Sequence, residues 1–138
     1  MAAAVLHNKV VKIDKPKIFV DSAGTSNWHA GQGPNPPSKK TWEKAGYKYD
    51  HTASQFNYSR LVSADLVLVM DRHNHEEVMR YVTSDEEEQK LYFLRQFDPT
   101  NPDSIEVPDP YSLPDSAFEE VLGMVEKATD GLIKQLLM

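Results

Sequence analysis

The sequence predicts an α/β fold with a parallel sheet, and three observations lead to this prediction. Residues 66–70 (LVLVM) are continuously apolar, which is typical of a strand buried on both faces of a parallel sheet. Strand and helix patterns alternate along the chain, so crossover helices join successive strands. The 138 residues, 40% of them hydrophobic, suffice for one core, and we expect a single domain over residues 1–138.

The first half of the chain predicts a helix, a strand and a second helix. Residues 1–10 are rich in alanine and other helix formers, although no capping residue precedes them. Residues 17–20 (KIFV) predict a short strand that ends at the turn DSAG. After an irregular loop, we expect Ser38 to cap a helix that stops at Gly46.

The second half continues the alternation. The strand at 66–70 precedes a polar helix over about 73–82, and the next strand covers 91–94. We interpret the acidic run 84–88 between them as a solvated turn. The last helix opens at Asp115 or Ser116, with Ser116 and Glu119 as a capping box. Its apolar residues form one stripe: Phe118, Val121, Leu122, Val125, Leu132, Ile133 and Leu136.

Composition argues against several classes of function. The net charge of -6, from 15 Lys plus Arg against 21 Asp plus Glu, gives no electrostatic reason to expect a nucleic acid or an anionic membrane as partner. No apolar run is long enough to span a membrane and no signal-peptide layout is present, so we expect a cytoplasmic protein. The absence of cysteine excludes disulfides, cysteine-ligated metals and thiolate chemistry by these residues. We expect neither a metal nor another cofactor.

Ligands of open parallel sheets bind beyond the carboxyl ends of the strands. The Asp21-Ser22 turn, Asp71 and the proline-rich loop 97–114 converge there. Within that loop Asp109 stands between two prolines, which restrict its backbone, and Tyr111 follows. An acid held rigidly beside an aromatic ring suits a general acid that protonates an aromatic leaving group. The alternative is that these Asp-Pro pairs only form turns.

Two metal hypotheses are weaker. Asp21 and Asp71, at neighbouring strand ends, could chelate Mg²⁺ together with a phosphate, but neither has a further acidic residue beside it. His73 and His75 are two residues apart on a helix, so their side chains diverge. We therefore interpret this pair as part of a solvated helix face.

Several segments in order resemble the low-molecular-weight protein tyrosine phosphatases. They are VDSAGT at 20–25, Trp28-His29-x-Gly31, ADLVLVMD at 64–71, VPDPY at 107–111 and FEEV at 118–121. The match runs from Met1 to the carboxyl terminus. The resemblance implies a three-layer, Rossmann-like fold of the phosphotyrosine protein phosphatase I type, with a four-stranded parallel sheet and flanking helices.

The resemblance also implies hydrolysis of phosphotyrosine, in a protein or a small phosphate ester, through a cysteinyl-phosphate intermediate. Asp109 matches the general acid, which protonates the departing phenol (pKa ~10) and then activates water. Tyr111 and Trp28 match positions that flank the substrate ring. Ser22 and His51 match residues that brace the phosphate loop by hydrogen bonds. Many members have a second tyrosine where this chain has Ser112.

The front of the chain departs from the family pattern. Members begin with a hydrophobic strand and a C-x5-R loop that supplies the nucleophile, and the next helix reads like residues 1–6 here. We therefore expect this chain to start just inside the first helix, to lack the first, interior strand, and to be inactive as given. We expect dimerisation, strand exchange or repacking of residues 10–20 to fill the gap.

The sequence leaves three functions open. The chain is a truncated phosphatase, a non-catalytic pseudophosphatase or interaction module, or a protein similar to arsenate reductase, which uses the same fold with added cysteines. The truncated phosphatase is favoured over the pseudophosphatase by the presence of Asp109, Ser22 and His51. A protein that had lost the phosphate loop would need neither a general acid nor residues that brace that loop. The motif DPY favours a phosphatase over an arsenate reductase.

Overall fold

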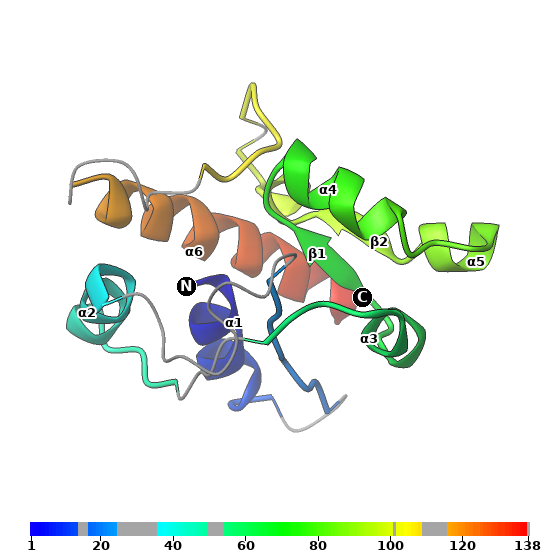
Figure 1. The fold of residues 1–138 in the computed structure, drawn as a ribbon. Coiled ribbons are helices and arrows are strands. Elements are labelled where there is room, and N and C mark those ends of the chain that lie inside the picture. The colour runs from blue at the N-terminus through cyan, green and yellow to red at the C-terminus, as the bar shows by residue number, and fades with distance from the viewer. Residues whose placement is uncertain (14–16, 25–35, 50–53, 101, 109–115, 138) are drawn as a thin grey trace.

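A computed structural model describes residues 1–13, 17–24, 36–49, 54–100, 102–108 and 116–137 (Figure 1). In these residues the sheet has two parallel strands, β1 (Val67–Val69) and β2 (Leu91–Phe93), with Leu68 opposite Tyr92. The helices are α1 (Ala2–Val10), α2 (Pro36–Lys44), α3 (Tyr58–Ser63), α4 (Arg72–Met79), α5 (Asp85–Glu88), the 3-10 helix η1 (Leu94–Phe97) and α6 (Ser116–Leu136). Among the residues described, no helix is both long and apolar enough to cross a membrane.

The sheet is covered on both faces, as the apolar run 66–70 predicts. Leu66, Leu68 and Met70 pack against a core cluster formed mainly by α1 and α6. Val67 and Val69, which point to the other face, belong to a second cluster that α3 and α4 complete. The chain therefore forms three layers, with helices on either side of a parallel sheet (Figure 1).

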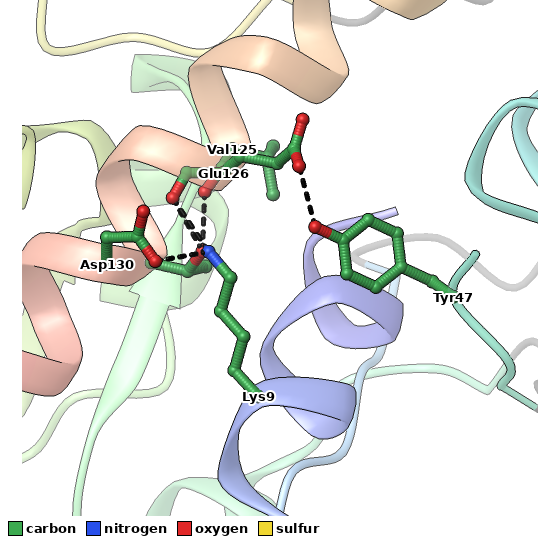
Figure 2. Close-up of polar contacts among 6 residues, drawn as sticks. Lys9, Tyr47, Val125, Glu126 and Asp130 are labelled. Carbon is green, nitrogen blue, oxygen red and sulfur yellow. Dashed lines mark hydrogen bonds and ion pairs between the residues drawn. The ribbon is translucent and has the colours of Figure 1, made fainter. Parts of the chain in front are cut away.

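Helix α1 packs on α6 through its alanine-rich face, where Ala4 and Val5 are fully buried. Lys9, at the end of α1, joins the two helices with polar contacts (Figure 2). Its Nζ donates to the carbonyl oxygen of Glu126 at 2.8 Å, to Thr129 Oγ1 at 2.8 Å and to Asp130 Oδ1 at 2.7 Å. Three acceptors satisfy the ammonium donors, so Lys9 fixes the position of α1 along α6.

Tyr47 makes a second polar link to α6. Its hydroxyl donates to Glu126 Oε2 at 2.6 Å (Figure 2). Tyr47 lies three residues beyond α2 and directly follows Gly46, which has the left-handed φ of 94°. The Gly46 amide bonds the carbonyl of Glu43 and the Tyr47 amide bonds that of Trp42, which together form a Schellman motif. The predicted stop at Gly46 is confirmed.

One predicted helix start and one predicted capping box need correction. Helix α2 begins at Pro36, two residues before the predicted cap Ser38. Proline is well suited to the first helical position, because the amide hydrogen it lacks would have no intrahelical acceptor there. The predicted opening of the last helix at Ser116 is confirmed. Ser116 is, however, the first helical residue rather than the cap, so Ser116 and Glu119 do not form the predicted capping box. The candidate cap Asp115 lies outside the described residues.

The strand predicted at 17–20 is not formed. Ile18 and Val20 are half-buried and pack against the α1–α6 core, whereas Phe19 between them is 92% exposed. This alternation is that of a strand, but within the described residues no neighbouring strand pairs with the segment. The nearest ladder contact is one parallel bridge between Gly24 and Gln55. Within the described residues, the structure thus shows two of the three strands expected in this chain.

The acidic run 84–88 is a short helix, α5, and not a solvated turn. Ser84 caps it by accepting the amide of Glu87 at 3.2 Å, and the four acidic side chains of its single turn lie near the positive end of the helix dipole. The neighbouring elements are shorter than predicted: α4 covers 72–79, and β2 ends at Phe93 because η1 begins at Leu94.

Helix α6 carries the predicted apolar stripe, and Gly131 brings it close to η1. The stripe residues Phe118, Val121, Leu122, Val125 and Leu132 are buried. A Cβ at Gly131 would overlap the carbonyl oxygen of Phe97 in η1, whereas a Cβ at Gly123, two turns earlier, would meet only open space. Close approach of two backbones is therefore what requires glycine at 131.

We expect Gly131→Ala to destabilise the chain by about 2 kcal/mol, because the added methyl group forces α6 away from η1. Gly123→Ala in the same helix is the matched control, and we expect it to be neutral or to stabilise by up to about 1 kcal/mol. Urea unfolding followed by circular dichroism measures both. Equal effects of the two substitutions would contradict the packing argument.

Burial, the hydrogen bond to Glu126 and the charges of Glu126 and Asp130 raise the pKa of Tyr47 to about 12, from an ordinary value of 10. Because the folded chain holds the phenol proton more tightly, this contribution is intact below pH 10 and is lost as the pH rises from 10 to 12. We expect Tyr47→Phe to flatten the fall of the unfolding free energy in that window. Lysine residues also titrate in this window, but they affect parent and variant alike. Parallel curves of unfolding free energy against pH for the two proteins would therefore disprove the contribution of the Tyr47–Glu126 hydrogen bond.

Candidate functional site

The carboxyl end of β1 is where the loop that leads to Asp109 joins the sheet. Asp71, the first residue beyond Met70, caps α4: its Oδ1 accepts the amide of Asn74 at 2.8 Å. The amide of Val107 donates to the carbonyl oxygen of Met70 at 2.7 Å, and the Val107 side chain is buried. The predicted meeting of the β1 end with the proline-rich loop is therefore present as far as residue 108.

Glu106 is bonded through its main chain and its side chain. Its carbonyl oxygen accepts from Arg95 Nη1 at 3.0 Å, which links the loop to η1. Its Oε1 accepts the backbone amide of Arg72, the first residue of α4, at 2.9 Å. Its own amide donates to Ser104 Oγ at 3.1 Å. Glu106 thus fastens the loop to two helices, η1 and α4, three residues before Asp109.

The Asp21-Ser22 turn is held by Arg60 of α3. Asp21 Oδ2 lies 2.6 Å from Arg60 Nη1, and Asp21 Oδ1 accepts the Ser22 amide at 2.8 Å. Arg60 Nη2 donates to Ser54 Oγ at 2.8 Å. Next to this cluster, Gly24 exchanges backbone hydrogen bonds with the 54–56 segment, at 2.8 and 2.7 Å. Arg60 therefore joins the Asp21-Ser22 turn to the chain that precedes α3.

Ser22 is half-buried beside Tyr49. Burial and then the negative charge of Asp21 raise the pKa of Tyr49, and a hydrogen bond with the Ser22 side chain opposes the rise. The serine side chain is thus engaged within the described part of the molecule. Its predicted role as a brace of a phosphate loop stays a prediction.

The other predicted site residues, Trp28, His51, Asp109 and Tyr111, lie outside the described residues. The structure brings the turn at 21–24 together with the residues from 54 onward, and it separately joins the loop up to 108 to the end of β1, to α4 and to η1. It does not test the roles that the family resemblance implies for the four side chains.

The carboxylates of the magnesium hypothesis are engaged elsewhere, Asp21 with Arg60 and Asp71 with the start of α4. In the part of the chain that the structure describes, no three His, Cys, Asp or Glu residues are grouped so that they could hold a metal ion. The ring of His75 stacks on Phe93, with centroids 5.3 Å apart, while His73 is exposed.

Sequence reasoning missed Arg60, Arg95 and Glu106, the residues that anchor the two loops. Each is a charged residue whose partners lie in other segments, and no periodicity or motif marks them. Glu106 had one weak signal, because it is the last charged residue before Val107-Pro108-Asp109.

Comparison with known proteins identifies the family. The family model described as low molecular weight phosphotyrosine protein phosphatase matches residues 1–137. The chain belongs to this family. A low molecular weight protein-tyrosine-phosphatase of Streptomyces coelicolor is 38% identical over 117 residues, which cover 84% of this chain and 71% of that protein. The low molecular weight protein-tyrosine phosphatase A of Mycobacterium tuberculosis is 38% identical over 116 residues, 83% of this chain and 69% of that protein.

A solved structure of the family has the same fold. The crystal structure of a protein tyrosine phosphatase from Entamoeba histolytica, with Hepes in its active site, superposes with a TM-score of 0.87 at 29% sequence identity. The alignment covers 98% of this chain and 86% of that one. The α/β fold class is thereby confirmed. The 138 residues nevertheless contain no cysteine, so the catalytic cysteine of this phosphatase family is absent from the chain.

We expect Arg60→Gln to increase the amide hydrogen exchange of Gly24 and Phe56 at least several-fold, because it removes the link between Asp21 and Ser54. Arg80→Gln is the matched control, since the side chain of Arg80, directly after α4, makes an exposed ion pair with Glu77 of that helix. Exchange measured by NMR checks the prediction, and unchanged rates at Gly24 and Phe56 would refute it.

Proposed function

We propose that this chain is the part of a protein tyrosine phosphatase that carries the general acid, and that residues outside these 138 supply the nucleophilic cysteine. One observation carries the proposal: the family model matches from residue 1 to residue 137, yet the chain contains no cysteine. The substrate class is phosphotyrosine in a protein, or a small aryl phosphate.

In the proposed reaction the thiolate attacks phosphorus and the bond from phosphorus to the tyrosyl oxygen breaks. Asp109 gives its proton to that oxygen, which makes the phenol a better leaving group. Asp109, now a carboxylate, takes a proton from water as the water oxygen attacks the cysteinyl phosphate, and inorganic phosphate and the thiolate are released. The prolines on either side of Asp109 limit the directions its carboxyl group can take.

The other site residues complete the proposal. Tyr111 and Trp28 flank the substrate ring, and Ser22 and His51 brace the phosphate loop. The contact of Ser22 with Tyr49, and the Arg60 cluster around Asp21, support a rigid turn at this position. Rigid support around a reacting group is what catalysis of this kind requires.

The chain by itself should not hydrolyse p-nitrophenyl phosphate, because no side chain in it replaces a low-pKa thiolate. Release of p-nitrophenol at the rate of the buffer blank is the expected result. Turnover above the blank that disappears in Asp109→Asn would overturn the argument from the nucleophile.

In a form of the protein that carries the cysteine loop, we expect Asp109→Ala to lower kcat by about 10² to 10⁴. Asp103→Ala in the same loop is the matched control, since Asp103 is exposed, and we expect its kcat to be unchanged. An unchanged kcat in Asp109→Ala would remove Asp109 from its role.

A pseudophosphatase that keeps the scaffold for binding is the second candidate, and the absent cysteine is the observation that favours it. The genomic sequence upstream of the Met1 codon separates the two. An in-frame C-x5-R-S-P with a start codon before it supports the phosphatase. An in-frame stop codon close upstream supports the pseudophosphatase.

We also propose that the chain, in isolation, pairs with a second copy of itself by dimerisation or strand exchange. The extended segment at 17–20, with Phe19 exposed, supports this, as does a sheet of only two strands in the described residues. We expect solution scattering to give the mass of a dimer and hydrogen exchange to show protected amides in 17–20. A monomer with rapid exchange in this segment would contradict the proposal.

A further inference from the structure

Glu106 is the residue at which the loop before Asp109 is held most firmly, and it uses three different groups to do so. Its carbonyl oxygen is bonded by Arg95 in η1, its Oε1 by the backbone amide of Arg72 in α4, and its amide bonds Ser104. The next residue, Val107, is bonded to the end of β1 and buried in the core on the α1–α6 side. We propose that Glu106 is a positioning residue for Asp109.

Only Pro108 separates the anchored residues 106–107 from Asp109. Asp109 follows Val107 by two residues, so their Cα atoms are at most roughly 7 Å apart. The intervening Pro108 has a fixed φ and restricts the backbone of Val107 as well. An anchor at 106–107 therefore limits the range of positions that the proposed acid at 109 can take. The catalytic consequence rests on the proposed function, whereas the anchoring does not.

The side chain of Glu106 carries the specific part of the anchor. Its Oε1 accepts the first amide of α4, where the helix dipole favours a negative charge. The additional ion pair with Arg72 Nε, at 3.6 Å, contributes little because the arginine side chain is 77% exposed. An acceptor oxygen at this point therefore matters more than the ion pair, and glutamine should replace glutamate well.

The anchor is tested in the chain as it stands by amide exchange of Val107, measured by NMR. We expect Glu106→Ala to increase the exchange rate of the Val107 amide about tenfold or more, because the substitution removes one hydrogen bond to a charged acceptor. Glu106→Gln, which keeps the acceptor oxygen, should stay within about threefold of the parent. Glu76→Ala, on the exposed surface of α4, is the matched control and should leave the rate unchanged.

Parent-like exchange of Val107 in Glu106→Ala would overturn the proposal. Should Glu106→Ala fail to fold, Glu106→Asp provides the same test, because its shorter side chain cannot reach the Arg72 amide and we expect exchange several-fold faster than in Glu106→Gln. Equal rates in the aspartate and glutamine variants would also overturn it.

The consequence for Asp109 is tested in a form that carries the cysteine loop, with two aryl phosphates. A displaced general acid slows phenyl phosphate, whose phenol (pKa ~10) needs a proton, far more than 2,4-dinitrophenyl phosphate, whose phenolate leaves unaided. Because hydrolysis of the cysteinyl phosphate is common to both substrates, the measured quantity is kcat/KM, which reports phosphoryl transfer to the cysteine. We expect Glu106→Ala to lower kcat/KM for phenyl phosphate about tenfold to a hundredfold and to leave that of the second substrate nearly unchanged, with rescue by Glu106→Gln.

Asp109→Ala in the same assay separates the two proposals. When Asp109→Ala shows the loss on phenyl phosphate and Glu106→Ala does not, the positioning role is wrong and the function stands. When Asp109→Ala shows no loss, the function assigned to Asp109 is wrong, and the positioning role is wrong with it. The anchoring of Val107 is then judged by the exchange measurements alone. An equal loss on both substrates in Glu106→Ala indicates general damage and contradicts the positioning role.

Discussion

Burial of β1 on both faces is the constraint on which the rest of the structure depends. A strand whose successive side chains face two different cores needs helices on each side, and α1 with α6 and α3 with α4 provide them. The same burial fixes where the strand ends, because the polar Asp71 cannot continue into either core and caps α4 instead. The loop toward Asp109 is then fastened to the last carbonyl before that cap.

Much of this arrangement was predictable from the sequence, for physical reasons that differ between elements. The apolar run 66–70 and the stripe of α6 carry their own periodicity, and Gly46 marks a position that requires a left-handed φ. The prediction of a solvated turn at 84–88 is wrong because Ser84 caps a helical turn there. Residues 17–20 have the pattern of a strand, but a strand needs a neighbour, and no local pattern reports whether the neighbour is there.

The candidate site was predictable in its motifs and not in its support. VDSAGT and VPDPY mark two segments by their motifs alone. The structure shows that Asp21 in the first is bonded to Arg60, and that Glu106, directly before the second, is bonded by Arg95. Such anchors depend on tertiary contacts between segments 11 to 39 residues apart, so no single segment reveals them. The family assignment rests on the motifs, whereas any account of how the acid is placed rests on the anchors.

Phe19 gives the isolated chain a property that concerns its fate rather than its chemistry. A large apolar side chain that is almost entirely in water, on an extended segment with no paired strand in the described residues, has the features that molecular chaperones and proteases recognise in incompletely folded proteins. We therefore expect burial of Phe19 against a second copy of the chain to lengthen the lifetime of the polypeptide in a cell.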